Sequence, residues 1–425
     1  MLLQLAVFED EAYRNFLPLA YTHPLFELKC GMYSLRERAE LELGRAQVLY
    51  AREHLAPKLR LLGYRVNEQV EGELLLLNAR VVAGSKLKSR LASMPQGYAA
   101  FAGGALAYAK LPPSLASRVA ELLSEARVRE AVQLVKRECI AVEPAARLVE
   151  YPWELVGLSA ELLAGDIMRL DWSSQGEVDE SVRVIGEGGF HVAKGARVEA
   201  YVVADTRGGP VYVDSEAVVE SFSLLKGPLY IGRKTIVFPS LLDTSYIGEV
   251  CRIGGEVSHS VFHGYSNKRH YGFIGHSYIG MWVNMGAGST NSNLKNTYGP
   301  VRVEAGGRKV DTGRQFVGCY IADHVKTSIG AMIFCRKVGV ASHVYGAATR
   351  DIPSFTAWIT GAEPVELELK GVLETARRMM ARRGVALTRE DEQVLRHVYQ
   401  ETVGERRALG VRKGRVSLQP ARRQI

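Results

Sequence analysis

Cysteine is scarce in this chain. The 425 residues include only five cysteines, and no two of them form a Cys-x-x-Cys pair. Disulfide frameworks and the common structural zinc sites need paired cysteines, so we expect a reduced, cytoplasmic setting without such a zinc site. The chain also lacks an apolar run of transmembrane length, and its first residues meet acids at Glu9 and Asp10 where a signal peptide has basic residues. We therefore expect a soluble protein with no membrane association.

Acidic residues are fewer than basic ones, 46 Asp and Glu against 54 Lys and Arg, which gives a net charge of +8. Much of the excess lies in the C-terminal segment, where no aromatic residue follows Tyr399. Nucleic-acid-binding surfaces commonly interleave aromatic and basic residues, so nucleic acid is an unlikely partner and a solvated basic tail is favoured. A basic surface also suits substrates that carry phosphates or coenzyme A.

The pattern of apolar residues changes twice along the chain. Residues 1–170 alternate apolar strands, at 2–8 and 73–83, with helical patterns over 34–56 and 111–139. Alternating strands and helices are typical of an α/β domain with parallel strands. Length alone allows two or three domains.

Residues 180–362 have no long helical pattern and follow a different period. Aliphatic residues recur every six positions, often followed by glycine. A six-residue period with one inward aliphatic residue per step predicts a hexapeptide-repeat parallel β-helix, whereas an antiparallel sandwich would show period two. The matching residues are Val192, Val198, Val213, Val219, Leu225, Ile231, Val237, Ile247, Ile253, Ile279 and Met285.

The period fails between Asn291 and Phe316. Residues 301–310 inside that gap predict a projecting hairpin with Gly306-Gly307 as its turn. Residues 363–425 return to a helical and basic pattern, with helices expected over 364–384 and 388–404. Thr388 is a plausible N-cap because acids follow it in the first turn.

Polar residues are unusually dense between Gly264 and Asn296. This segment holds a histidine among several Asn and Lys residues on an otherwise regular β-scaffold, which indicates a site. The candidates are His270, Asn284, Asn291, Asn293 and Lys295.

Several blocks of the chain resemble one family. They are IGGEVSHSVFHGYSNKRHYGFIG at 253–275, GAGSTNSNLKN at 286–296, TGRQFVGCYIADHVKTSI at 312–329, FEDEAYRNFLPLAYTHPLFELKCGMYSLRERAE at 8–40 and YPWELVGLSAELLAGDI at 151–167. They are similar to divergent sugar nucleotidyltransferases that carry a left-handed β-helix. These are related to the bifunctional glucosamine-1-phosphate N-acetyltransferase and N-acetylglucosamine-1-phosphate uridyltransferase. The resemblance implies an α/β nucleotidyltransferase-like domain, a left-handed β-helix, a homotrimer, acetyl-CoA as donor and an active site between subunits.

The resemblance also implies roles for individual residues. His270 matches the general base that takes a proton from the attacking amine. Substrate-binding positions are Lys268, Asn284, Asn291, Asn293 and Lys295, and Cys319 and Lys326 lie near the coenzyme positions. For the asparagines, an alternative is a structural ladder inside the β-helix. For His270, the alternative is a hydrogen bond to the next coil.

The chain departs from the related acetyltransferases at several positions. Ser258 and His259 stand where a lysine is expected, Phe273 where a tyrosine contacts the phosphosugar, and Cys319 where a serine lies near the coenzyme. The acceptor sugar therefore stays open. A hexapeptide β-helix can also bind zinc through histidines, as γ-type carbonic anhydrases do, but no pair among His259, His263, His270 and His276 has that family's five-residue spacing.

The N-terminal domain lacks the Gly-rich triphosphate loop of related nucleotidyltransferases, because strand 2–8 runs directly into acids. The turn 22–25 contains His23 and no lysine, and residues 78–80 replace a Gly-Asp pair that would hold Mg²⁺. The candidate nucleotide-binding residues are Lys29, Arg36, Asn78 and Arg80, and the candidate Mg²⁺ ligands are Asp10 and Asp166.

The expected function is acetyl-CoA-dependent N-acetylation of an amino-sugar phosphate such as glucosamine 1-phosphate. Sugar-1-phosphate nucleotidyl transfer from UTP or another NTP is possible in the N-terminal domain. The alternatives are a degenerate N-terminal domain, with the protein a trimeric nucleotide-sugar-binding scaffold, or a zinc β-helix like the γ-carbonic anhydrases.

Overall fold

The computed structural model describes residues 4–173 and 175–415, so the last part of the basic tail, 416–425, lies outside the described residues. The chain divides into two compact units, Met1–Tyr151 and Pro152–Ile425. None of the helices in the described residues has the length and hydropathy to cross a bilayer.

Unit 1 is built on a seven-stranded sheet with the order β10-β8-β9-β6-β1-β4-β5. Strands β6, β1, β4 and β5 run parallel, and β9 is antiparallel to both β6 and β8. The central strands are buried and rich in aliphatic residues, as expected for strands covered on both faces. The strands are β1 (Gln4–Phe8), β4 (Val48–Tyr50), β5 (Arg65–Val66), β6 (Leu74–Asn78), β8 (Tyr98–Ala102), β9 (Ala105–Leu111) and β10 (Ile140–Val142).

The predicted bounds of the two helices expected in unit 1 are wrong. The pattern over 34–56 contains α1 (Leu35–Leu43), which begins at a Ser34 capping box and ends at Gly44 with φ +90°. Three buried residues of that pattern then form strand β4 beside β1, because tertiary pairing overrides the helical spacing. The pattern over 111–139 is two helices separated by Ala126 at φ +59°. The helices after α1 are α2 (Ala56–Leu61), α3 (Ser85–Ser93), α4 (Pro113–Ser124) and α5 (Val128–Glu138).

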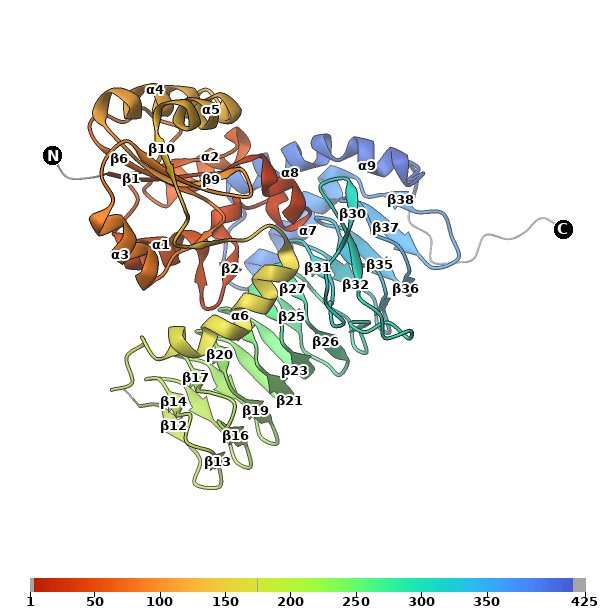
Figure 1. The fold of residues 1–425 in the computed structure, drawn as a ribbon. Coiled ribbons are helices and arrows are strands. Elements are labelled where there is room, and N and C mark those ends of the chain that lie inside the picture. The colour runs from red at the N-terminus through yellow and green to blue at the C-terminus, as the bar shows by residue number, and fades with distance from the viewer. Residues whose placement is uncertain (1–3, 174, 416–425) are drawn as a thin grey trace. The chain divides into compact units, whose positions relative to one another are not determined.

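Unit 2 is dominated by stacked coils of short parallel strands, as the six-residue period predicts for a β-helix (Figure 1). Each coil contributes a strand to face 1, then to face 2, then to face 3, and β21 and β23 turn from face 1 to face 2. Face 1 comprises β12 (Glu177–Val178), β15 (Arg197–Val198), β18 (Val218–Val219), β21 (Ile236–Asp243), β23 (Arg252–Ser258), β25 (Asn267–Lys268), β32 (Lys326–Thr327), β35 (His343–Tyr345) and β37 (Thr356–Ile359).

The other two faces repeat the same stacking. Face 2 comprises β13 (Arg183–Ile185), β16 (Val203–Asp205), β19 (Leu224–Lys226), the ends of β21 and β23, β26 (Phe273–Gly275), β28 (Thr290–Asn291), β33 (Met332–Ile333) and β36 (Ala347–Ala348). Face 3 comprises β14 (Phe190–Val192), β17 (Val211–Val213), β20 (Leu229–Ile231), β22 (Tyr246–Ile247), β24 (Val261–Gly264), β27 (Tyr278–Met281), β31 (Tyr320–Ile321) and β34 (Lys337–Val338).

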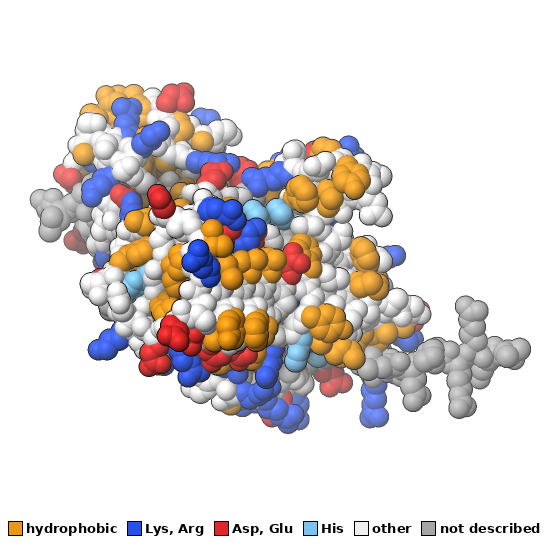
Figure 2. All heavy atoms as spheres, turned by 90° about the horizontal axis from the view of Figure 1, so that it is seen from below, with side chains coloured by type: hydrophobic (Ala, Val, Ile, Leu, Met, Phe, Trp, Pro, Cys, Tyr) orange, Lys and Arg blue, Asp and Glu red, His pale blue; other side chains and the backbone are white. Residues whose placement is uncertain are grey.

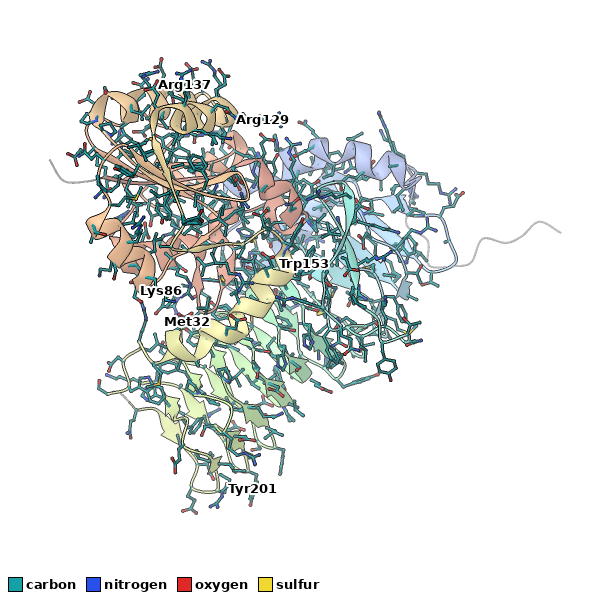
Figure 3. All side chains as sticks on the ribbon, viewed as in Figure 1. Met32, Lys86, Arg129, Arg137, Trp153 and Tyr201 are labelled. Carbon is teal, nitrogen blue, oxygen red and sulfur yellow. The ribbon has the colours of Figure 1, made fainter. Side chains whose placement is uncertain are left out.

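One continuous apolar core fills the β-helix. All of the aliphatic residues in the six-residue pattern belong to it and are at most 5% exposed. The corners carry outward side chains: Tyr201 points away from the coils (Figure 3) and stacks on Phe222 with ring centroids 5.5 Å apart. Helix α6 (Pro152–Ile167) packs beside β20 on face 3.

The insertion follows the sequence prediction, but the first C-terminal helix is shorter than the predicted 364–384, because β38 (Val365–Glu366) pairs with β37 before the helix begins. Strands β29 (Arg302–Ala305) and β30 (Arg308–Asp311) form the hairpin, and both turn glycines have positive φ. Helix α7 (Leu369–Ala381) is followed by α8 (Arg389–Glu401), whose Thr388 cap accepts a hydrogen bond from the Asp391 N–H, and by α9 (Val403–Ala408).

Candidate functional site

His270 lies on the corner between faces 1 and 2, in the turn that joins β25 to β26. It is exposed, and no hydrogen bond to its imidazole is found among the described residues. The turn itself is held from inside the coil. Lys268 donates from Nζ to the backbone oxygens of Gly254 (2.6 Å), His270 (3.3 Å) and Gly272 (2.8 Å).

Lys268 is not placed to bind substrate, in contrast to the sequence prediction. It pairs with Ile253 in the inward column of face 1 and is 1% exposed. Burial lowers the pKa of its ammonium to about 8. The three carbonyls explain how a cation is tolerated there, because buried charges need hydrogen-bonding partners. The neighbouring coils approach so closely that a Cβ on Gly254 would lie 1.8 Å from the Arg269 carbonyl oxygen.

Asn291 and Cys319 also lie inside the β-helix, so their predicted contacts with substrate and coenzyme are wrong. Asn291 accepts a hydrogen bond from the Gly275 N–H (2.8 Å) and donates to the Gly275 carbonyl (3.1 Å). It thus fits the structural alternative of an interior amide that satisfies the next coil. Cys319 is fully buried beside Ser277, and burial raises the pKa of its thiol to about 11.

Asn293 and Lys295 lie past the corner between faces 2 and 3. The Asn293 side-chain amide lies 3.0 Å from Nδ1 of His276, whose ring stacks on His259 at 4.9 Å. Burial lowers the pKa of His276 to about 4, which keeps the ring neutral at ordinary pH. Lys295 is half-buried and donates to the Pro300 carbonyl (2.7 Å) at the base of the insertion.

Asn284 and Lys326 stand in one outward column on face 1, with Asn267 below them and His343 above. Asn267 donates from Nδ2 to Oδ1 of Asn284 at 2.7 Å. Lys326 donates from Nζ to the His324 carbonyl at 2.7 Å, and burial lowers the pKa of its ammonium to about 7. The same burial, with Lys326 adding to it, lowers the pKa of His343 to about 4.

A cavity of about 300 Å³ opens over this column. Its other walls are the aromatic corner Tyr265 and Trp282, with ring centroids 4.5 Å apart, and helix α7 with the residues that follow it. Asn267 and the arginines of this wall are not among the residues predicted from the sequence. The signal was present in the run 377–383, where Arg378 and Arg382 recur at the four-residue spacing of one helix face. The α7-side lining residues are Thr375, Arg378, Met379, Arg382 and Arg383.

In unit 1, the ends of the parallel strands β1 and β6 carry a closed polar network. Asp10 accepts from Arg80 Nη2 (2.7 Å) and from Asn78 Nδ2 (2.9 Å), and it caps the 3-10 helix Glu11–Phe16. Arg80 also pairs with Glu150. Burial alone would lower the pKa of Arg80, but Asp10 and Glu150 together raise it. These groups satisfy one another, so the structure shows no unused cation or carboxylate among them.

The other two predicted nucleotide-binding cations, Arg36 and Lys29, are paired in the same way. Arg36 is buried and bonds to Glu27 and, at 2.6 Å, to Glu40. Lys29 donates to Glu37 at 2.8 Å. Asp166, the second candidate Mg²⁺ ligand, is buried on α6 and therefore belongs to unit 2.

The structure gives no support to the alternative of a zinc-binding β-helix among the described residues. Within the described residues, no group of three close ligand atoms includes His259, His263, His270 or His276. The rings of His259 and His276 instead stack with each other, and His276 stacks in turn on Phe316 at 5.2 Å.

Lys268→Met provides a test of the interior lysine. The folded-state pKa of Lys268 lies below its ordinary value of 10.5, so the unfolded chain binds more protons between about pH 8 and 10.5. The wild-type protein should therefore gain stability relative to Lys268→Met as pH rises through that window. Unfolding midpoints from tryptophan fluorescence, at about pH 7.5 and about pH 10, measure the effect. A pH-independent difference between the two proteins would contradict it.

Comparison with known proteins finds relatives of part of the chain. Residues 5–174 match the family model described as sugar nucleotidyl transferase. A bifunctional sugar-1-phosphate nucleotidylyltransferase/acetyltransferase of Sulfurisphaera tokodaii is 32% identical over 151 residues, which are 34% of this chain and 38% of that protein. The aligned region thus spans well under half of the relative's length. Together these matches confirm the resemblance to a divergent sugar nucleotidyltransferase family.

Proposed function

We propose that unit 2 is an acetyl-CoA-dependent N-acetyltransferase whose acceptor is an amino-sugar phosphate, and that its β-helix is left-handed. The relative from Sulfurisphaera tokodaii, named as a nucleotidylyltransferase and an acetyltransferase, supports this assignment. His270 is the general base, and Asn284 contacts the amino sugar.

The observation that carries the proposal is the setting of His270. Its imidazole is exposed and has no hydrogen bond among the described residues, while Lys268 fixes its turn from within. A general base needs a free ring nitrogen at a fixed position, because proton transfer requires hydrogen-bond reach to the amine. An imidazole that only joined two coils would use its nitrogens on the neighbouring coil, as Asn291 uses its amide.

A homotrimer would complete this site. Exposed apolar residues lie on the same corner and on face 2: Tyr271 follows His270, Ile329 occupies the corner two coils further on, and Met332 stands on β33. Exposed apolar patches commonly mark interfaces. On the face drawn in Figure 2, hydrophobic side chains gather in patches between charged ones. In a trimer, residues on different faces of two copies can meet, so a neighbouring copy could add side chains to the surface around His270. Light scattering should give three chains per particle.

The test of the acetyltransferase assignment is acceptor-dependent thiol release. Acetyl-CoA is incubated with a panel of amino-sugar phosphates, and free coenzyme A is measured with a thiol reagent. We expect release with at least one amino-sugar phosphate and none with its N-acetylated form, which lacks the nucleophilic amine. Absence of release with the whole panel would contradict the proposal and favour a non-catalytic scaffold, which should also fail to bind coenzyme A.

For unit 1 we propose a sugar-1-phosphate nucleotidyltransferase-like domain of low activity. The family match supports the relationship. The ion pairs of Arg36, Arg80 and Lys29 with acids favour low activity, since the triphosphate would have to displace those acids. UTP or another NTP is the nucleotide, and Mg²⁺ the metal. Asp10, the predicted Mg²⁺ ligand at the strand ends, would have to exchange Arg80 for Mg²⁺ to hold it.

Pyrophosphate release from UTP and other NTPs with several sugar 1-phosphates measures this activity. We expect slow turnover that requires Mg²⁺, because the metal chiefly stabilises charge at the transferring phosphorus. Fast turnover without metal would show that the domain has been misinterpreted. No turnover with any pair would favour a degenerate domain that only binds nucleotide sugars.

A further inference from the structure

The cavity over face 1 is rich in cations that have no acidic partner in its walls. Of the described residues that line it, four are Lys or Arg and none is Asp or Glu. Arg378 is paired with Glu374 on its own helix, at 2.9 Å. Lys326 has only carbonyl oxygens as partners, and no salt bridge of Arg382 or Arg383 is found among the described residues.

Two of these cations, Arg382 and Arg383, also repel each other. Burial lowers the pKa of Arg383, and the adjacent Arg382 lowers it further. Burial likewise lowers the pKa of Arg252, and the positive charge of Arg383 lowers it further. Clustered like charges destabilise a fold unless an anion joins them, so a ligand with negative charge would relieve the repulsion.

The walls carry complementary features for a specific ligand. Asn267 and Asn284 place amide groups on the floor of the cavity, where their mutual hydrogen bond fixes their orientation. Tyr265 and Trp282 supply an apolar wall against which the hydrocarbon face of a sugar ring or a nucleobase can pack. A few directed polar groups beside aromatic surface are typical of small-molecule sites.

We propose that this cavity binds the phosphate group of a phosphorylated small molecule, with Arg382, Arg383 and Lys326 as its cationic ligands. Guanidinium groups suit this role because they can make paired, charge-assisted hydrogen bonds to phosphate oxygens. That the phosphate belongs to the amino-sugar acceptor rests on the proposed function above. The coenzyme offers the same chemistry through its own phosphates.

The experiment is titration calorimetry of the full chain with glucosamine 1-phosphate, inorganic phosphate, coenzyme A and 3′-dephospho-coenzyme A. The test variant is Arg382→Gln/Arg383→Gln. Arg377→Gln is the matched control, since Arg377 lies on α7, just before Arg382 and Arg383, but pairs with Glu374 and Glu392. Both variants alter solvent-accessible side chains at or near the end of α7, and circular dichroism confirms folding.

We expect the double variant to bind glucosamine 1-phosphate about 10- to 100-fold more weakly, because two charge-assisted contacts are lost. Arg377→Gln should stay within about twofold of wild type, since exposed ion pairs contribute little. Wild-type affinity should also fall with added salt.

Other results separate the possibilities. If the double variant binds coenzyme A more weakly but binds 3′-dephospho-coenzyme A as the wild type does, the cavity holds the coenzyme's 3′-phosphate. That result would support phosphate binding by the cavity and would contradict its assignment to the amino-sugar acceptor. If the double variant binds all four probes as the wild type does, or if the wild type binds none of them, the proposal is overturned. Weakened phosphate binding in a protein that shows no acceptor-dependent thiol release would support the cavity and refute the acetyltransferase assignment.

Discussion

His270→Ala should reduce acetyl transfer by roughly two to four orders of magnitude, the usual contribution of a general base. Its imidazole is exposed and unbonded among the described residues, so its removal costs no internal hydrogen bond. The variant should therefore fold and assemble as the wild type does. The measurement is kcat/KM from thiol release, with the assembly state checked by light scattering.

A matched control is His259→Asn. His259 lies at the corner between faces 2 and 3 with φ +47°, a conformation that Asn tolerates better than most residues. Its nitrogen lies 2.8 Å from the Ser258 hydroxyl, so it has a structural partner that His270 lacks. We expect near wild-type activity for this control. Activity of His270→Ala within a few-fold of wild type would remove His270 from the mechanism.

Arg80→Met should strongly destabilise unit 1. Arg80 is 2% exposed and bonds to Asp10, Glu150 and the Val149 carbonyl. Methionine keeps much of the apolar volume but leaves the Asp10 carboxylate without its cation. Breaking one partner of a buried ion pair costs about 3–5 kcal/mol.

Hydrogen exchange measures the stability of each unit separately, whereas tryptophan fluorescence reports on unit 2 alone. All four tryptophans, Trp153, Trp172, Trp282 and Trp358, lie in unit 2. We expect exchange in β1 and β6 to accelerate roughly 100- to 1,000-fold in Arg80→Met, with the β-helix unchanged. The control is Arg118→Met, because the Arg118–Glu138 pair is exposed and should contribute about 1 kcal/mol or less. Equal exchange in wild type and Arg80→Met would show that the network is dispensable.

The architecture was largely predictable because its main signals are local and periodic. The six-residue spacing located the inward aliphatic residues of the β-helix, all of which lie in one core. The glycine pair fixed the hairpin turn, and Thr388 with its acids fixed the start of α8. Strand β4 was missed because its apolar residues also fit a helical spacing, and only pairing with β1 decides between the two.

The site was less predictable because coil lengths vary around the insertion. The six-residue period then no longer shows which side chains point inward, and the resemblance alone predicts ligand-binding roles for Lys268 and Asn291, although both are interior. The cavity over Asn284 depends on α7, which is distant in sequence, and no local pattern links Arg383 to Lys326. The ion pairs of unit 1 depend in the same way on which strand ends meet.

The most direct test follows an isotopically labelled acetyl group from acetyl-CoA in the presence of the full-length protein and glucosamine 1-phosphate or a related amino-sugar phosphate. The proposal predicts that the label appears on the sugar nitrogen, identified by mass spectrometry, with wild-type protein and not with His270→Ala. If the label stays on coenzyme A or appears only as free acetate, the assignment of unit 2 as an amino-sugar acetyltransferase is wrong.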